Sequence, residues 1–415
     1  MASRLQMVAL AWRNLWRQGR RSLISILAVA LVVVFAIFMY SMGGALTNGM
    51  YGDLTKEVGN LQLHADGYRD ARDFSESLLS DAADISNTVA EVSPEAIVVG
   101  ALRVPGLLAG EDRSRGLAIQ GQDWPELIRE DFVADYLAEG VFVEGENLTG
   151  IMLGQSLATA LEVDLGDDVY VYAPGTEGYG AAAYTVEGLL DFVDPNQEIN
   201  AAYISLAAAQ ELAAPDAVSA LQLHYPEIRT LKEDSLIAED IGALKAALGA
   251  DISIESWQEL DPSLAVMVRF FTPIMVVYSS IFFVLAGLLV LNTVYLSTLE
   301  RVREFGVIIS LGARGRQIMR MVTLESLLMC LTGAAIGLIL GLGFVALGAN
   351  GMTFPGYAEE MLAEAGLPNI FYLSIDWWQI LLAVGFAVLI AFFAAFGPAR
   401  MAANIEPAEA MRYTA

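Results

Sequence analysis

The sequence predicts an α-helical membrane protein with four transmembrane helices and a large α+β extracytoplasmic domain inserted between the first two. Two observations carry this prediction. Apolar residues make up 55% of the 415-residue chain and are concentrated in a few long runs. Acidic residues are concentrated between the first two of these runs, where residues 45–267 contain 40 Asp and Glu against 10 Lys and Arg.

Four apolar runs are long enough to cross a hydrocarbon layer of about 30 Å as helices. They cover residues 22–44, 268–296, 322–347 and 377–397. Backbone polar groups in lipid must be satisfied within the segment, so each run is expected to be helical. The run at 22–44 exceeds the apolar core of a signal peptide and no cleavage site follows it, which indicates a retained first span.

The distribution of arginine predicts the orientation of the chain. Residues 1–21 hold five arginines and no acid, and the segments 297–321 and 398–415 hold further arginines. By the positive-inside rule both termini and the middle segment are cytoplasmic, whereas residues 45–267 and 348–376 lie outside, in the periplasm or the extracellular space. Four spans require the same arrangement. Tryptophans and arginines at helical spacing predict a cytoplasmic interfacial helix within residues 1–21.

The region 45–267 reads as an α+β domain with a core of its own. We expect strands at 97–102, 106–109, 141–143, 151–153, 169–173 and 184–189, and helices at 155–161, 205–212 and 230–248. Helical periodicity then continues into the second span without a flexible linker. The acidity of the domain fits a salty habitat, solubility or a cationic partner, and it excludes nucleic-acid binding.

Several kinds of chemistry are missing from the sequence. None of the three lysines, Lys56, Lys232 and Lys245, follows a glycine, so the chain has no P-loop and is not an ATPase by itself. It also lacks HExxH. His64 and His224 are isolated and are expected to be ordinary strand or surface residues, so no metal site is predicted.

The segment between the second and third spans, residues 297–321, carries the strongest functional signal. Charged residues lead into a short apolar-faced helix around Phe305, and Gly312 supplies a helix stop. Such a helix, held on the cytoplasmic side, is typical of a docking element for a partner. A basic loop anchored by lipid explains the same residues equally well.

The third span carries small residues at a spacing of four, namely Gly333, Gly337 and Gly341. Glycines at this spacing let a second helix approach closely in lipid, so we expect a helix-packing face there. An ordinary glycine-rich span is the alternative. The single cysteine, Cys330, lies in the same span, so the chain has no internal disulfide.

The chain resembles the FtsX-like permease family, which includes MacB-type efflux permeases and the lipoprotein-releasing LolC/LolE pair. The resemblance rests on Glu300-Arg301-x-Arg303-Glu304-Phe305-Gly306-x5-Gly312-Ala313, on Glu325-Ser326, on the tail at 397–412 and on the Met152–Val169 element. It extends from about residue 8 to 412. The resemblance implies an ABC transporter permease in the inner membrane, nearest the LolC/LolE-like members with a separate ATPase.

The resemblance also implies partners and site residues. Two copies of the ATPase subunit, which bind ATP and Mg, dock on the coupling segment; this chain binds no cofactor. The coupling residues are Glu300, Arg301, Arg303, Glu304, Phe305, Gly306, Leu311 and Gly312. A second permease chain, identical or paralogous, completes the membrane part. MacB-type proteins carry a fused N-terminal ATPase, whereas this chain begins about 20 residues before its first span, which favours separate subunits.

The outer domain of such a permease has a split membrane-proximal lobe, here 46–118 with 218–265, and an inserted lobe at 119–217. The function implied is mechanotransmission, in which ATP hydrolysis moves the outer domain to extract or release lipoproteins or another amphipathic or lipid cargo. A periplasmic lipoprotein or lipid carrier is a further expected partner. Aromatic and methionine residues of the first two spans suggest a cargo cavity lined by Phe35, Met39, Met42, Met275, Tyr278 and Phe282. The alternative is an FtsX-type regulatory scaffold that activates a cell-wall hydrolase without transport.

Overall fold

The structure is a computed structural model that describes residues 12–13, 19–71, 73–79, 81–192, 195–356, 361–362 and 370–404. The chain divides into two compact units. We call residues 1–45, 269–352 and 371–415 the helical unit, and residues 46–268 and 353–370 the α+β unit. Most of the predicted interfacial helix at 1–21, and the tail beyond residue 404, lie outside the described residues.

Four long helices are apolar enough to cross a membrane, and each contains one of the four predicted spans. They are α2 (Gly19–Val58), α10 (Pro262–Glu300), α12 (Gly315–Gly348) and α14 (Trp377–Ala403). The first helix continues past its predicted end at Gly44. Gly43 is helical and lies close to α10, since a Cβ on it would be 3.1 Å from Cε1 of Phe271. Both α2 and α10 therefore have residues in each unit.

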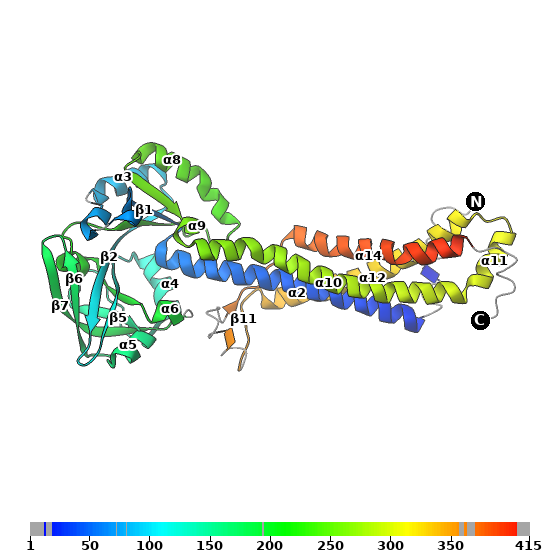
Figure 1. Ribbon diagram of the computed structural model, residues 1–415, viewed down its shortest axis with the longest axis horizontal. Coiled ribbons are helices and arrows are strands. Elements are labelled where there is room, and N and C mark those ends of the chain that lie inside the picture. Colours follow the sequence, from blue (N-terminus) through cyan, green and yellow to red (C-terminus); the bar gives the residue numbers. More distant parts are fainter. Residues whose placement is uncertain are drawn as a thin grey trace. The chain divides into compact units, whose positions relative to one another are not determined.

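Helices α2 and α10 run side by side in the helical unit (Figure 1). Ser25 donates a hydrogen bond to Thr293 at 2.7 Å. Further along, the hydroxyls of Tyr40 and Ser279 are 2.7 Å apart in a buried position. Each pair satisfies two hydroxyls inside an apolar unit, where an unpaired polar group is costly. These bonds set the register of α2 against α10.

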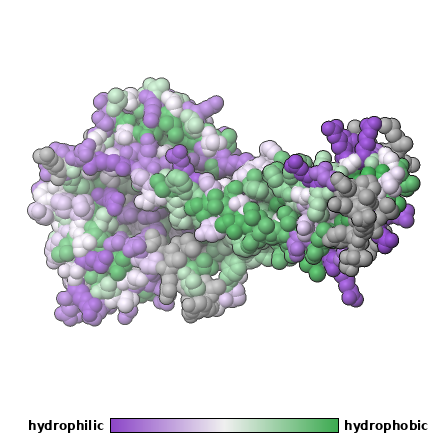
Figure 2. All heavy atoms as spheres, turned by 45° about the vertical axis from the view of Figure 1, so that its right-hand side comes forward, coloured by the Kyte–Doolittle hydropathy of each residue, from purple (hydrophilic) through white to green (hydrophobic). Residues whose placement is uncertain are grey.

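Helix α12 packs against α2 through its glycines. A Cβ on Gly333 would lie 2.7 Å from the carbonyl oxygen of Ile26, and one on Gly337 would lie 2.6 Å from that of Ala30. The helix backbones therefore meet at a distance that side chains would prevent. Helix α14 buries a row of small residues in the same unit, namely Ala383, Ala387, Ala391, Ala394, Ala395, Ala399 and Ala402. Hydrophobic residues gather over the helical unit in the face that Figure 2 shows.

The α+β unit is built on a ten-stranded mixed sheet. Its strands are β1 (Leu61–Ala65), β2 (Ile97–Ala109), β3 (Ser114–Gln122), β4 (Leu137–Gly140), β5 (Gly150–Gly154), β6 (Asp168–Gly175), β7 (Gly178–Leu190), β8 (Ala202–Ser205), β9 (Ala220–His224) and β10 (Ile252–Ser256). Their order is β10-β1-β9-β2-β3-β8-β5-β7-β4, and β6 pairs with both β2 and β7. A separate two-stranded sheet joins β11 (Met352–Thr353) to β12 (Ile370–Phe371).

Helices cover this sheet at several places. They are α3 (Ala82–Val92), α4 (Glu126–Tyr136), α5 (Gln155–Leu161), α6 (Pro195–Glu198), α7 (Leu206–Leu212), α8 (Ala238–Leu248) and α9 (Trp257–Leu260), with 3-10 turns η1 (Tyr68–Asp70), η2 (Phe74–Ser77) and η3 (Glu233–Ile237). Helix α9 begins at a capping box in which Ser256 and Glu259 bond each other's backbone N–H groups. This cap ends β10 and leads directly into α10.

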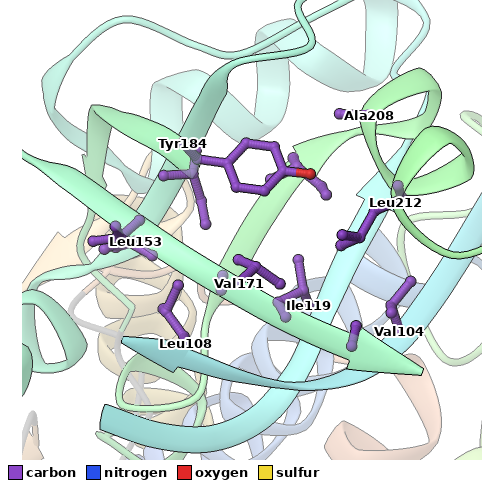
Figure 3. Packing of buried hydrophobic residues seen from close by; sticks show 14 of the residues in the cluster. Val104, Leu108, Ile119, Leu153, Val171, Tyr184, Ala208 and Leu212 are labelled. Atoms are coloured by element: carbon purple, nitrogen blue, oxygen red, sulfur yellow. The ribbon is translucent and has the colours of Figure 1, made fainter. Parts of the chain in front are cut away.

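Four hydrophobic clusters of described residues fill the α+β unit, and the smallest joins Tyr51, Trp257 and Leu264. One lies among β2, β3, β5, β6, β7, α5 and α7, and includes Val104, Ile119, Val171 and Tyr184 (Figure 3). A second lies among β1, β9, β10, α3 and α8. A third is largely aromatic and centres on Phe132 of α4. The lobe boundary predicted near residue 118 falls within β3 and stays a prediction.

Candidate functional site

The coupling segment forms one short helix between two long ones. Helix α10 ends at Glu300, α11 covers Val302–Ser310, and α12 begins at Gly315. Arg301 interrupts the helical conformation with φ −104° and ψ 8°. The interruption lets α11 take a direction of its own between α10 and α12, where Figure 1 shows it at one end of the helical unit.

The end of α11 is a complete Schellman motif around Gly312. The residue has a φ of +96°, a left-handed conformation that glycine adopts without strain. The N–H of Gly312 donates to the carbonyl of Ile309 at 2.9 Å, and the N–H of Ala313 donates to that of Ile308 at 3.2 Å. These two bonds satisfy carbonyls that the helix end leaves open. Gly312 thus stops the helix, as its place in the sequence suggested.

One face of α11 is anchored inside the helical unit. Phe305 is fully buried, and Val302 and Gly306 are buried beside it. The guanidinium of Arg301 lies 5.0 Å from the centre of the Phe305 ring, close enough for a cation–π contact. Arg301 also donates to Glu325 of α12 at 2.9 Å and to Glu304 at 3.3 Å. Arg301 therefore joins α11 to α12.

The opposite face of α11 is exposed and combines charge with apolar side chains. Arg303, Val307 and Ile308 are exposed, and Leu311 is 82% exposed. Glu300, just before α11, forms an ion pair with Arg21 of α2. Exposed apolar residues rimmed by charge are typical of an interaction surface. A single short helix thus presents one face to the helical unit and the other outward.

A small cavity of about 20 Å³ lies behind α11. Ser22 of α2, Ser297 and Thr298 of α10 and Glu325 and Ser326 of α12 contribute to its wall. The hydroxyl of Ser326 is buried and has no hydrogen-bond partner among the described residues. A space of this size holds about one water molecule, which such a polar wall can bond.

The six residues predicted to line a cargo cavity lie on α2 and α10. The rings of Phe35 and Phe282 are in contact, with centroids 4.5 Å apart. Phe282 is 39% exposed and Tyr278 is 55% exposed. Met275 lies near Gly43, since a Cβ on that glycine would be 3.5 Å from the methionine Cγ. The two cavities that we describe are lined by other residues, so the cargo cavity stays a prediction.

Sequence reasoning missed a polar cluster in the α+β unit that joins α2 to the region before α10. Tyr51 of α2 is fully buried, and its hydroxyl donates to Asp234 of η3 at 2.9 Å. Asp234 also accepts a bond from Nε1 of Trp257 at 2.9 Å, and Asn60 donates to the Tyr51 hydroxyl at 2.9 Å. The rings of Tyr51 and Trp257 meet edge to face. The α2 residues beyond Gly44 are thus bonded into the α+β unit.

The next turns of α2 contact a different part of the same unit. Asp53 accepts a bond from the Tyr136 hydroxyl of α4 at 3.1 Å, and Lys56 pairs with Asp135. Glu57 accepts bonds from Gln197 at 2.7 Å and from Tyr203 at 3.0 Å. The end of α2 is therefore held on two sides, by η3 and α9 and by α4, α6 and β8. The predicted first helix ends at Gly44, so the sequence does not predict this helical extension.

Four helices that are long and apolar enough to cross a membrane, together with a large α+β unit, fit an integral membrane protein. The family model for the MacB-like periplasmic core domain matches residues 22–234, and the FtsX-like permease C-terminal model matches residues 276–407. The first match covers half of the chain. The chain belongs to the MacB-like and FtsX-like family of ABC transporter permeases.

Curated relatives agree with this family. The macrolide export ATP-binding/permease protein MacB of Chlorobaculum tepidum is 36% identical over 125 residues, which are 30% of this chain and 16% of that protein. The uncharacterized ABC transporter permease YknZ of Bacillus subtilis is 29% identical over 160 residues, 39% of this chain and 36% of the relative. An uncharacterized ABC transporter permease of Methanocaldococcus jannaschii is 22% identical over 287 residues, 66% of this chain and 65% of the relative. The chain thus covers a small part of the length of MacB.

Proposed function

We propose that this chain couples ATP hydrolysis in a separate ATPase subunit to motion of its α+β unit. The observation that carries the proposal is α11, whose inner face is fixed by Phe305 and Arg301 and whose outer face is exposed. A partner that pushes on the outer face acts on α12 through the pair of Arg301 and Glu325. The same force reaches α10 through the backbone, because only Arg301 separates α11 from α10.

Motion then has a continuous path to the α+β unit. Helices α2 and α10 are bonded to each other by the pairs of Ser25 with Thr293 and Tyr40 with Ser279. Each continues without interruption into the α+β unit, where α2 ends at Val58 and α10 begins at Pro262. A helix transmits displacement along its axis because its backbone bonds form one stiff ladder. This supports mechanotransmission.

The partners of the complex are part of the proposal. Two copies of an ABC ATPase, which bind ATP and Mg, dock on residues 299–312 from the cytoplasm. A second permease chain packs against this one in the inner membrane, and the α+β unit lies on the opposite side of that membrane from both termini. The relative MacB is a macrolide exporter by name and joins ATP-binding and permease parts in one protein. This pairing supports an ATPase as the partner.

The proposed cargo is amphipathic, either a lipoprotein or another lipid-bearing molecule that this permease extracts or releases. Phe35, Phe282 and Tyr278 present aromatic rings on α2 and α10, and the last two are substantially exposed. Replacing Phe35, Met39, Met42, Met275, Tyr278 and Phe282 singly by Asn is expected to reduce transport of such a cargo. Unchanged transport in all six variants would contradict the predicted cargo cavity.

Co-purification from mildly solubilised membranes tests the coupling. We expect an ABC ATPase to co-purify with the chain and to be lost with Leu311→Asp, which places a charge on the exposed face of α11. Leu127→Asp is the matched control, because Leu127 is 52% exposed on α4 in the α+β unit. Equal ATPase recovery with both variants would contradict docking at α11. Recovery of a cell-wall hydrolase instead of a carrier would favour the FtsX-type scaffold.

A further inference from the structure

A polar cleft in the α+β unit lies where two parallel strands separate. Strands β3 and β8 pair only over Gln120–Gln122 with Tyr203–Ser205. Toward their N-terminal ends they part and leave a cleft of about 300 Å³, at the lower end of the range for ligand sites. Its wall contains Glu57, Arg103, Leu117, Ala118, Gln120, Gln197, Asn200, Ala201 and Tyr203.

The wall of β3 carries backbone groups that no strand of the described chain pairs with. Gly110 donates to the carbonyl of Arg113 at 2.9 Å, and bonded and non-bonded residue pairs alternate from there along β2 and β3. By this alternation Ala118, opposite Pro105, belongs to a non-bonded pair, which agrees with the missing N–H of proline. The N–H and C=O of Ala118, and likewise those of Gly116, therefore face the open edge.

The cleft wall contains one guanidinium, that of Arg103, and one carboxylate, that of Glu57, which already accepts bonds from Gln197 and Tyr203. Arg103, Arg113 and Arg115 all lie on the β2–β3 hairpin, three of only ten basic residues between 45 and 267. Arg103 is exposed at the cleft and forms no ion pair with a described residue. Arg115 donates to Asn200 in the cleft wall at 3.4 Å, yet its buried Nε has no partner among the described residues. Arginine in such a position suits a carboxylate.

The remaining polar groups suit peptide amides. Glu57 accepts from Gln120 at 3.4 Å in addition to Gln197 and Tyr203, which leaves the carbonyl oxygens of both glutamines for a ligand. Burial, and then the charge of Glu57, raise the pKa of the Tyr203 phenol, so its hydroxyl remains a donor at neutral pH. The cleft thus offers a strand edge, side-chain amides and a guanidinium within one wall.

We propose that this cleft binds a short, extended, acidic peptide segment of a partner protein, which adds a strand to the open edge of β3 and places a carboxylate at Arg103. Main-chain bonds to Gly116 and Ala118 supply affinity, and the guanidinium supplies the preference for acidic sequences. Because Glu57 is in the last turn of α2, the bound peptide touches the helix that carries the proposed motion. Binding itself does not depend on that motion.

Fluorescence anisotropy with the full chain in detergent micelles tests the site. The probe is a fluorescein-labelled heptapeptide of alternating Thr and Asp, compared with versions that carry Asn or Lys in place of Asp. We expect the Asp peptide to bind at least tenfold more tightly than either. Affinity for it is expected to fall at least tenfold in Arg103→Gln, which removes the charge at an exposed position, and in Ala118→Pro, which removes the N–H from the open edge.

Two matched variants are controls. Ala118→Ser retains the N–H, and Arg229→Gln removes an exposed arginine elsewhere in the α+β unit; both are expected to bind like the parent chain. Binding that is unchanged in Arg103→Gln and Ala118→Pro overturns the site, as does equal affinity for the Lys peptide. Either result leaves the co-purification of an ATPase unaffected, so the two proposals fail separately.

Discussion

The hydroxyl of Tyr51 donates a hydrogen bond to Oδ1 of Asp234 at 2.9 Å, which ties α2 to η3 across 183 positions of the chain. The other oxygen of Asp234 accepts from Trp257 at 2.9 Å and from Gln258 at 3.2 Å. One carboxylate therefore connects the helix that follows the first span to the residues that precede α10.

Asp234→Ala is expected to loosen this connection. It leaves the buried Tyr51 hydroxyl and the indole N–H without their acceptor, at a cost of about 1–3 kcal/mol. Hydrogen exchange is expected to increase at the amides of residues 48–58 and 254–264 and to stay unchanged in α3. Asp251→Ala, at an exposed loop position, is the control. Uniform protection in both variants would show that Asp234 does not hold these segments together.

The pair of Arg301 and Glu325 is expected to matter more than the pair of Arg301 and Glu304. Glu325 is 19% exposed and Glu304 is 42% exposed, so solvent screens the second pair more strongly. Glu325→Ala is expected to destabilise the chain by about 1–3 kcal/mol, whereas Glu304→Ala costs less than about 1 kcal/mol. The apparent Tm in micelles measures both. A larger effect of Glu304→Ala would reverse this order.

Features with a local cause were predictable from the sequence. The four spans follow from hydropathy alone, and Gly312 ends α11 because a left-handed φ favours glycine there. The helix at 155–161 and the strands around Ile151–Leu153 and Val169–Ala173 also agree with their predictions. The strand predicted at 141–143 was wrong. The strand there is β4 at Leu137–Gly140, and the residues that follow are irregular.

Features that depend on distant partners were not predictable. The two strands expected at 97–102 and 106–109 are one strand, because Pro105 lies opposite Ala118 where no N–H is needed. The helix expected over 230–248 begins as a 3-10 turn whose Asp234 bonds Tyr51. The cleft between β3 and β8 arises from strands about 80 positions apart. No residue pattern within β3 or β8 predicts that the two strands pair with each other.

Histidine 224 is expected to make the α+β unit less stable in acid. Burial lowers the pKa of His224 from 6.5 to about 4. Below pH 6.5 the unfolded chain binds a proton at His224 that the folded chain does not. The free energy of unfolding therefore decreases as the pH is lowered from 6.5 to about 4, by about 3 kcal/mol in total. His224→Leu removes this loss. The measurement is the apparent Tm of both chains between pH 4 and pH 8.

The same variant tests a second property of His224. Its Nε2 is buried without a hydrogen-bond partner among the described residues, so an apolar side chain of similar size removes an unsatisfied group. His224→Leu is therefore expected to match or exceed the Tm of the parent at pH 8 and to exceed it by more at pH 5. Other titrating groups are common to both chains and cancel in the difference. A difference that shrinks toward pH 5 would contradict the lowered pKa.

The glycines of α12 give a matched comparison within one helix. A Cβ on Gly337 would lie 2.6 Å from the carbonyl oxygen of Ala30, whereas nothing lies within 4 Å of a Cβ on Gly343. Gly→Ala favours a helix by about 1 kcal/mol at either position, so contacts decide the difference. Gly343→Ala is expected to preserve or raise the Tm in micelles. Gly337→Ala is expected to lower it, because α12 must move away from α2 to make room for the added methyl group. Equal Tm values for the two variants would mean that the close approach of α12 to α2 does not contribute to stability.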